Sequence, residues 1–381
     1  MILGVAMNIG IAGAGLMGRL LAWQLLRRGH RVTLFDRDTQ DARASAARVA
    51  AAMIAPYSEV AGGERQVFDW GLSALTRWPE LLAELKQDTG IDVYFQKRGS
   101  IVVAHARDRG NLEHFQSLLQ HAVPEHQERV HKLSREKVSE LEPELGTQFD
   151  GGLWLEDEGT LDNRELLSAL SRAIRTLGGS LKGEWREGVV VASVSANRID
   201  CGGEIFEFDL AIDARGFGAK PQLHDLRGVR GEVLWVHAPE VNLTRPVRLM
   251  HPRYQLYIAP KRDHVYVIGA TQIESESLAP ITVRSSLELQ SALYSVHTGF
   301  AEATVLDAFA NCRPGFMDNL PRIDCSNRTN GVPGLLRVNG LFRNGYLLSP
   351  FMLDMSLQCI AGHVHHPVVR ELRLVESVNE Q

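Results

Sequence analysis

A glycine-rich segment near the N-terminus has residue types and spacing suited to binding a phosphorylated cofactor. It matches the pattern G-x-G-x-x-G and consists of Gly13, Ala14, Gly15, Leu16, Met17 and Gly18. Gly13 permits a tight turn, Gly15 lets the backbone approach a pyrophosphate, and Gly18 allows close packing of a following helix. Free N–H groups at the start of such a helix attract phosphate oxygens. The six residues therefore form a predicted site for an anionic dinucleotide.

An acidic residue follows at the distance expected for the ribose of that dinucleotide. Asp36 comes 18 residues after Gly18, where its carboxylate can accept hydrogen bonds from both ribose hydroxyls and repel a 2′-phosphate. We include the adjacent Arg37 among the candidate cofactor-binding residues. These residues alone do not distinguish FAD from NAD, and G-x-G-x-M-G also resembles the opening of nicotinamide-dependent hydroxyacid dehydrogenases.

The elements around the glycine motif predict a βαβ unit at the start of the chain. Residues 8–13 have the pattern of a buried strand, a helix then stops at Gly29, and RVTLFD forms the next strand. Amphipathic helices are predicted at 65–85 and 163–179. Residues 228–270 contain successive strands separated by turn residues, which predicts an antiparallel sheet. Because the hydroxyacid dehydrogenases are largely helical in this half, FAD is favoured over NAD(P).

These patterns predict an α/β protein with two domains. The first is a Rossmann-type FAD-binding domain of the glutathione-reductase type, and the second is an α+β substrate domain with a mainly antiparallel sheet. The FAD-binding domain is predicted to be discontinuous, because the last third ends in a strand, a glycine turn and a helix that return to it. We assign to it residues 1–80, 150–224 and 308–381, and to the substrate domain residues 81–149 and 225–307.

The composition favours a folded protein with neither nucleic acid nor a membrane as partner. The 381 residues carry 41 basic and 46 acidic side chains, a formal net charge of -5, which provides no broad cationic surface for nucleic acid. No stretch reaches about 18 uncharged apolar residues, so no transmembrane segment is expected. The apolar N-terminus lacks a basic leader and the four cysteines are scattered, which predicts a cytoplasmic protein with reduced thiols. The sequence leaves the oligomeric state open, with a homo-oligomer as one alternative.

Four further segments carry motifs of one known family. Residues 45–56, SAARVAAAMIAP, match an alanine-rich stretch that ends in A-G-M-L-A-P. Residues 257–261 and 268–271 match Y-L-V-P-R and I-G-A-T. Arg313-Pro314 begins a match to R-P-x-x-x-D-x-x-P, and residues 340–350 match G-H-x-R-N-G-I-L-L-A-P. On these motifs the chain resembles the D-amino-acid oxidase superfamily, most of all its glycine oxidase branch, over nearly its full length.

This resemblance implies roles for individual residues. The family binds the substrate carboxylate on an arginine that corresponds to Arg313, a tyrosine at the position of Tyr257 faces the ligand, and Arg343 is a second candidate anchor. A planar guanidinium can bind a carboxylate through two hydrogen bonds. An ion pair for Arg313 and a packed strand position for Tyr257 stay as alternatives. The FAD contacts predicted outside the glycine motif and Asp36-Arg37 are Ser45, Ala52, Met53, Val189, Gly216, Arg343, Asn344, Gly345, Tyr346 and Leu347.

The implied reaction is oxidation of the C–N bond of a small amine or amino acid, such as glycine, N-methylglycine or a D-amino acid, by hydride transfer to flavin N5. The electrons then pass to oxygen or another acceptor. Ala52, Arg215 and Gln255 depart from the family pattern, so a flavoprotein acting on a larger or protein-bound substrate stays an alternative. Cys312 lies near the position at which the sarcosine oxidase branch attaches its flavin covalently. No metal site is predicted.

Overall fold

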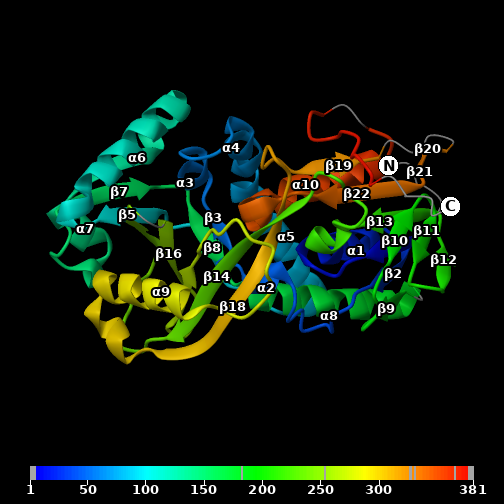
Figure 1. Ribbon diagram of the computed structural model, residues 1–381, viewed down its shortest axis with the longest axis horizontal. Helices are drawn as coiled ribbons and strands as arrows, with labels where there is room; N and C mark the ends of the chain where they lie inside the picture. The colour runs from blue at the N-terminus through cyan, green and yellow to red at the C-terminus, as the bar shows by residue number, and fades with distance from the viewer. Residues whose placement is uncertain are drawn as a thin grey trace.

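Two large β-sheets, one toward each end of the molecule, organise the chain in the computed structural model (Figure 1). The structure describes residues 6–181, 183–252, 255–325, 328–329, 332–363 and 366–375. The chain passes between the two ends several times, so each sheet contains strands that are distant in sequence. In the described residues, no helix is long and apolar enough to cross a membrane.

The first sheet contains the glycine motif and has six described strands. Its order is β19 (Arg322–Asp324), β22 (Leu335–Asn339), β13 (Leu210–Asp213), β1 (Asn8–Ala12), β2 (Arg31–Phe35) and β9 (Glu184–Arg186). Neighbouring strands are parallel except for the β19–β22 pair. Helices α1 (Leu16–Arg27), α8 (Asn163–Leu181) and α10 (Gly345–Ile360) pack on one face, and the small sheet β10 (Ser193–Ser195), β11 (Arg198–Asp200) and β12 (Ile205–Glu207) packs on the other. Covering on both faces is typical of parallel sheets.

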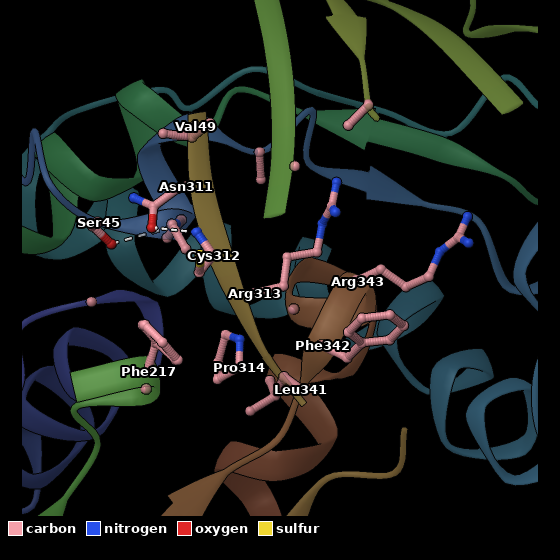
Figure 2. Close-up of a pocket in the computed structure, with 18 of the residues that line it drawn as sticks. Ser45, Val49, Phe217, Asn311, Cys312, Arg313, Pro314, Leu341, Phe342 and Arg343 are labelled. Atoms are coloured by element: carbon pink, nitrogen blue, oxygen red, sulfur yellow. Dashed lines mark hydrogen bonds between the residues drawn. The ribbon is translucent and has the colours of Figure 1, made fainter. Parts of the chain in front are cut away.

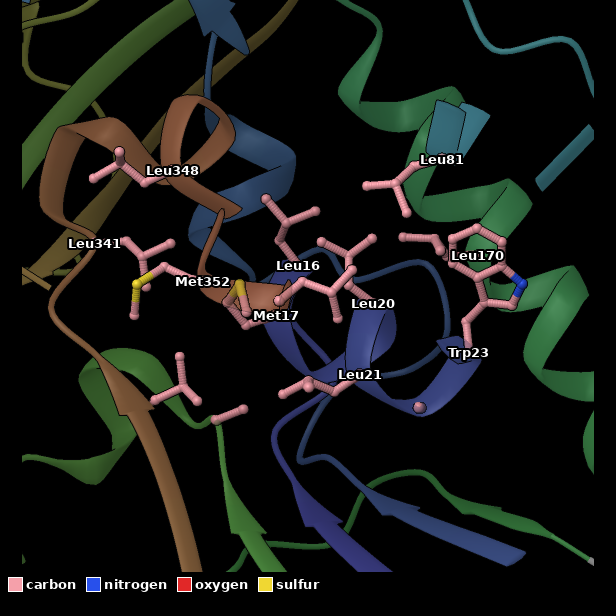
Figure 3. Close-up of a cluster of buried hydrophobic side chains, with 14 of the residues drawn as sticks. Leu16, Met17, Leu20, Leu21, Trp23, Leu81, Leu170, Leu341, Leu348 and Met352 are labelled. Atoms are coloured by element: carbon pink, nitrogen blue, oxygen red, sulfur yellow. The ribbon is translucent and has the colours of Figure 1, made fainter. Parts of the chain in front are cut away.

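Helix α1 is buried along almost its whole length, from Leu16 to Leu26. Figure 3 shows the apolar side chains of α1 packed with side chains from other elements. These side chains are Leu81, Leu170, Leu341, Leu348 and Met352. A helix that is buried on nearly all sides must be surrounded by other elements. The packing therefore fixes the position of the glycine turn from which α1 starts.

The second sheet is mainly antiparallel. Its order is β18 (Thr304–Gly315), β14 (Arg227–His237), β17 (Val265–Gly269), β16 (Gln255–Pro260), β15 (Val247–Met250), β5 (Ser100–Ala104), β7 (Gly151–Leu155) and β6 (Val130–Ser134). Only β15 and β5 pair in parallel among these strands. Helix α9 (Val283–Val296) packs in the cluster that contains Ile101 and Val103, and α6 (Arg109–Ala122) in the cluster that contains Val102 and Ala104. Because side chains alternate along a strand, the two helices cover opposite faces.

The longest pair of strands, β14 and β18, connects the second sheet to the first. The two strands pair from Arg227 with Gly315 to His237 with Thr304, with one register shift after Trp235. After β18 the chain continues into β19 of the first sheet. Residues near the end of β18 are therefore held at the junction between the two sheets.

The predicted fold class is confirmed, with a mostly parallel sheet that begins with a βαβ unit and a second sheet that is mainly antiparallel. The helix expected at 65–85 is divided into α4 (Arg65–Leu72) and α5 (Ala74–Thr89), and the Ser73 hydroxyl at the junction donates to the Trp70 carbonyl at 2.7 Å. Strand β18 crosses the predicted domain boundary at residue 308. The division into domains stays a prediction.

The packing of α1 predicts that Gly18 tolerates no side chain. An added Cβ would lie 1.8 Å from the Gly13 carbonyl oxygen. We expect Gly18→Ala to lower the free energy of unfolding by about 2 kcal/mol or more, because the turn or the helix must move. Urea-induced unfolding measures this. The control is Gly110→Ala in α6, where an added Cβ meets no atom within 4 Å and alanine stabilises a helix by up to about 1 kcal/mol. Equal stability of Gly18→Ala and the wild type would contradict the prediction.

Candidate active site

A cavity of about 1490 Å³ lies between the two sheets. Its walls come from the β1–α1 turn, the segment 44–53, strands β14, β17 and β18, and the segment 341–347. The volume exceeds the roughly 300–1,000 Å³ of a typical small-ligand pocket, so a large cofactor and a substrate fit together. The predicted site residues that line the cavity are Gly13, Ala14, Gly15, Leu16, Met17, Asp36, Arg37, Ser45, Ala52, Met53, Gly216, Tyr257, Arg313, Arg343, Asn344, Gly345, Tyr346 and Leu347.

The glycine turn presents backbone donors to one end of the cavity. Gly13 has a φ of 97°, and an added Cβ would lie 2.6 Å from the Ala214 carbonyl oxygen. No side chain caps the N-terminus of α1 at Gly15, so the first N–H groups of the helix are available to an anion. The Asp36 carboxylate accepts hydrogen bonds from the backbone N–H groups of Ala14 and Asp38, the latter at 2.8 Å. This end fits the pyrophosphate and ribose of a dinucleotide.

A buried arginine that the sequence analysis did not select holds this end together. Arg19 is fully buried, and its guanidinium donates to the carbonyls of Ala14 at 2.6 Å, Leu167 at 2.9 Å and Gln40 at 2.9 Å. Burial lowers the pKa of Arg19 to about 10, which leaves it charged at neutral pH. Its contacts join α1, α8 and the loop after β2. The available signal in the sequence was a charged residue in the first turn of a mostly apolar helix.

The middle of the cavity wall contains a residue in an unusual backbone conformation. Ala52 has a φ of 57°, a left-handed value that destabilises a residue with a Cβ by roughly 1–2 kcal/mol. Its carbonyl accepts hydrogen bonds from the Leu161 N–H at 3.2 Å and the Thr160 hydroxyl at 3.1 Å. The family pattern has glycine at this position, a residue that adopts this conformation without strain, whereas this chain has alanine with one more methyl group. Strain of this kind persists only where neighbouring contacts enforce it.

A buried lysine next to the other sheet bonds to the residue before Ala52 and to both residues that donate to the Ala52 carbonyl. The ammonium of Lys261, which follows β16, donates to the Ala51 carbonyl at 2.9 Å, the Thr160 hydroxyl at 2.8 Å and the Leu161 carbonyl at 2.6 Å. Burial lowers the pKa of Lys261 to about 8. The side chain therefore ties the β16–β17 hairpin to the wall segment that contains Ala52.

A second helix N-terminus reaches the cavity from the opposite direction. Helix α10 begins at Gly345, and its N-cap residue Asn344 makes no capping hydrogen bond with its side chain. The Asn344 side-chain oxygen is buried without a partner among the described residues. The Tyr346 hydroxyl donates to the Ala47 carbonyl at 2.9 Å, so it holds the wall segment. The free N–H groups of α10 make this end suitable for an electron-rich group.

Arg313 lies at the end of β18 and faces the cavity. Its guanidinium lies over Gly231, where an added Cβ would be 2.3 Å away, and donates to the Thr271 carbonyl at 3.1 Å. Within the part of the chain that the structure describes, no carboxylate lies within ion-pair distance of Arg313. Burial, together with the nearby charge of Arg343, lowers the pKa of Arg313 to about 10, and the charge of Glu59 opposes this decrease. Arg313 is therefore a cation at neutral pH that an external anion can neutralise.

Tyr257 lines the same part of the cavity. It lies in β16 and is 6% exposed, and its buried hydroxyl makes no hydrogen bond of normal geometry in the described residues, although the Ser58 side chain acts on it as a hydrogen-bonding neighbour. Burial raises the pKa of Tyr257, so the hydroxyl stays protonated. A buried hydroxyl without a well-formed hydrogen bond is unfavourable, and a ligand in the cavity can accept its hydrogen bond. The packed aromatic role left open for Tyr257 does not use this hydroxyl.

Arg343, in contrast, already has an acidic partner. Its Nε lies 2.7 Å from Oε2 of Glu59, and it contacts the Gln272 side-chain oxygen at 3.3 Å. The carboxylate of Glu59 raises the pKa of Arg343. Figure 2 shows the Arg313 and Arg343 side chains extending on one side of β18, with Ser45 and Asn311 on the other side. Sequence reasoning missed Glu59, which belongs to the short helix α3 (Pro56–Val60).

Helix α3 is held in place by a buried carboxyl group. Glu158 accepts hydrogen bonds from the Ser58 N–H at 2.6 Å, the Ser58 hydroxyl at 2.9 Å and the Ser100 hydroxyl. Arg248 donates to the Ser58 carbonyl at 2.9 Å. These bonds fix Ser58, and thereby the backbone that carries Glu59. Burial raises the pKa of Glu158 to about 7.

Two predicted cofactor residues do not line the cavity. Gly18 packs against the glycine turn, as its spacing predicted, and the Val189 N–H donates to the Asp36 carbonyl at 2.9 Å. Arg215, which departs from the family pattern, pairs with Asp213 at 2.7 Å, so its guanidinium is held by that carboxylate.

The Cys312 thiol lies 3.6 Å from the Ser277 carbonyl oxygen, and burial raises its pKa.

The side chain of Gln255, which departs from the family pattern, lies outside the described residues. Over the ranges that the structure describes, no three His, Cys, Asp or Glu side chains are grouped as ligands for a metal ion.

Comparisons with known proteins define the class. The family model described as FAD dependent oxidoreductase matches residues 8–352, so the chain belongs to this family and its cofactor is FAD. The "Putative thiamine biosynthesis oxidoreductase ThiO" of Rhizobium etli is 36% identical over 346 residues, which cover 91% of this chain and 94% of that protein. The glycine oxidase of Geobacillus kaustophilus is 26% identical over 90% of each chain. The crystal structure of a glycine oxidase from Geobacillus kaustophilus superposes with a TM-score of 0.81 at 23% identity, covering 94% of this chain and 95% of that one.

These findings decide between the open alternatives for the cofactor. The predicted family, the FAD cofactor and the FAD-dependent oxidoreductase class are confirmed. The alternative of a nicotinamide-dependent hydroxyacid dehydrogenase is wrong, because the matched family uses FAD. The two uncapped helix N-termini, the close approach at Gly13 and the size of the cavity fit this cofactor.

The contacts of Lys261 generate a prediction for cofactor affinity. Lys261→Met leaves the carbonyls of Ala51 and Leu161 without this donor, which destabilises the wall segment by about 1–3 kcal/mol. We expect the FAD dissociation constant to rise about tenfold or more, as measured by flavin fluorescence during titration of the apoprotein. Lys261→Arg keeps a cationic donor and should restore affinity to within about threefold. An unchanged affinity in Lys261→Met would show that the tether does not support the cofactor.

The raised pKa of Glu158 predicts a pH dependence of stability. In the unfolded chain a glutamate titrates near 4.5, and in the folded protein Glu158 titrates near 7. The contribution of its proton to stability is therefore complete below pH 4.5 and is lost as the pH rises through about 7, by up to about 3 kcal/mol. Thermal unfolding of the FAD-loaded protein between pH 5 and 8 measures this. Relative to Glu158→Gln, the wild type should lose stability over that range, and a constant difference would contradict the assignment.

Proposed function

We propose that this FAD enzyme oxidises the C–N bond of a small α-amino acid that is held by its carboxylate on Arg313. The observation that supports this proposal most strongly is the charge of Arg313, which faces the FAD cavity with no carboxylate partner among the described residues. The Tyr257 hydroxyl in the same cavity supplies a second donor for that carboxylate. The similarity to ThiO and to glycine oxidase supports oxidation of an amino-acid-like amine.

The residues of the chain supply binding and orientation. When bound, FAD would supply the two-electron oxidant, which accepts the α-hydrogen of the substrate as a hydride. The nitrogen lone pair would then form the second C–N bond of an iminium ion, and loss of a proton from nitrogen would give the imine. Arg313 and Tyr257 fix the carboxylate, so the α-carbon has one position in the cavity. Met53 and Val233 give this part of the cavity an apolar wall. Water then hydrolyses the imine to a 2-oxo acid and ammonia or an amine.

Glycine is the substrate that we propose first, and N-methylglycine second. The methyl group of Ala52, where the family pattern has glycine, narrows the wall and favours a substrate without a large side chain. The electron acceptor that we propose is oxygen, on the similarity to glycine oxidase. The similarity to ThiO supports a place for the product in thiamine biosynthesis.

An anaerobic titration of the FAD-loaded protein tests the proposed function. Glycine, N-methylglycine, D-alanine and L-proline are added in turn, with methylamine as the control that lacks a carboxylate. We expect glycine or N-methylglycine to bleach the flavin absorbance and methylamine to leave it unchanged. A flavin that no small amino acid bleaches would contradict the proposal and favour a larger or protein-bound substrate.

The role of Arg313 leads to a prediction for catalysis. Charge-assisted hydrogen bonds contribute about 1.5–3 kcal/mol, so Arg313→Met should lower kcat/KM for the best amino acid about tenfold to 150-fold. Arg313→Lys keeps the charge but loses the bidentate geometry, so its kcat/KM should lie between those of the wild type and Arg313→Met. Steady-state kinetics, with FAD content measured by absorbance as the control, check this order. Equal kcat/KM values for Arg313→Met and the wild type would exclude Arg313 as the anchor.

A further inference from the structure

Two of the arginines that line the cavity, Arg313 and Arg343, differ in their charge balance. Arg343 is paired with Glu59 through contacts of 2.7 Å and 3.3 Å. Arg313 donates only to the backbone carbonyls of Arg230 and Thr271, at 3.4 Å and 3.1 Å, as far as the described residues show. The side chains of Arg313, Arg343 and Glu59 together carry one net positive charge. A ligand with one carboxylate balances that charge, whereas a ligand with two carboxylates exceeds it.

Glu59 extends from a fixed backbone, and its carboxylate is paired with Arg343. Its side chain is 12% exposed, and the preceding residue, Ser58, is bonded through its N–H, hydroxyl and carbonyl to Glu158 and Arg248. In the same helix the Tyr57 hydroxyl donates to Asp157 at 3.3 Å. A second ligand carboxylate cannot reach Arg343 without displacing Glu59 from its partner or lying beside it as a like charge.

We propose that Glu59 is a specificity-determining residue, which occupies Arg343 and so restricts the site to amines with a single carboxylate. The inference rests on the proposed function, in which Arg313 binds the first carboxylate. Exclusion of a partner by a fixed like charge is a common source of specificity. The substrate class that follows is a small monocarboxylic amino acid, and dicarboxylic amines such as iminodiacetate are rejected.

The first test uses the wild-type FAD-loaded protein and two inhibitors. Acetate and malonate differ by one carboxylate, and binding of each is followed by the change in flavin absorbance at constant ionic strength. We expect the dissociation constant of malonate to exceed that of acetate at least tenfold. Tighter binding of malonate than of acetate would overturn the inference without any variant.

The second test uses Glu59→Gln, which keeps the shape of the side chain and removes its charge. We expect the malonate dissociation constant to fall at least tenfold while that of acetate changes less than threefold. The ratio of kcat/KM for iminodiacetate to that for N-methylglycine should rise by a similar factor. An unchanged malonate dissociation constant in a variant that retains FAD would overturn the inference.

Three control variants separate this role from a general effect of charge. Glu59→Asp keeps the charge and should still reject malonate. Glu125→Gln removes the partner of Arg65 in an exposed ion pair and should leave the preference unchanged. Adding Arg343→Met to Glu59→Gln should abolish the gain for malonate. If malonate binding responds as expected but no amino acid bleaches the flavin, the proposed function fails and the charge inference stands.

Discussion

The guanidinium of Arg313 is the charge on which the substrate end of the cavity depends. A cation that is buried without a charged partner is unfavourable, and here the described residues offer it only carbonyl oxygens. Its position follows from the β14–β18 pair, because the glycine at 231 leaves the space that the guanidinium fills. The same arrangement that makes the empty site unfavourable favours a ligand carboxylate. The strand pairing thus places a cation where it can contribute to the binding energy of a substrate carboxylate.

The cofactor end depends on backbone rather than on side chains. The turn at Gly13 and the start of α10 at Gly345 both bring uncapped helix N-termini to the cavity. Between them, Ala52 has a left-handed conformation and accepts hydrogen bonds from β8 (Gly159–Leu161), while Lys261 donates to the adjacent Ala51 carbonyl. Lys261 directly follows β16 of the second sheet. The shape of the FAD cavity therefore depends on contacts between the two sheets.

Local patterns predicted the cofactor end well. The strand, glycine turn, helix and second strand up to Asp36 lie within 40 residues, so their geometry follows from neighbouring residues. The motifs at Tyr257, Arg313 and Arg343 were predicted from family resemblance, and the structure brings these three side chains to one cavity. Their assigned roles stay proposals until a ligand is observed.

The residues that sequence reasoning missed act through distant partners. Lys261 contacts a carbonyl 210 positions away, and Arg343 pairs with a glutamate 284 positions away. Neither spacing forms a pattern that can be seen along the chain. No role is assigned to Glu59 from the sequence, and Lys261 enters only as the last residue of the motif at 257–261. Their importance arises only from tertiary packing, which also turned the single charge of Arg19 into a buried link between elements.

The most direct measurement is a crystal structure of the FAD-loaded protein with acetate bound in the cavity. We expect the acetate carboxylate to lie on the guanidinium of Arg313 within hydrogen-bond distance of the Tyr257 hydroxyl, with Glu59 still paired to Arg343. Acetate bound to Arg343 with Glu59 displaced, or a cavity in which Arg313 is covered by FAD itself, would contradict the central claim that Arg313 is the substrate anchor.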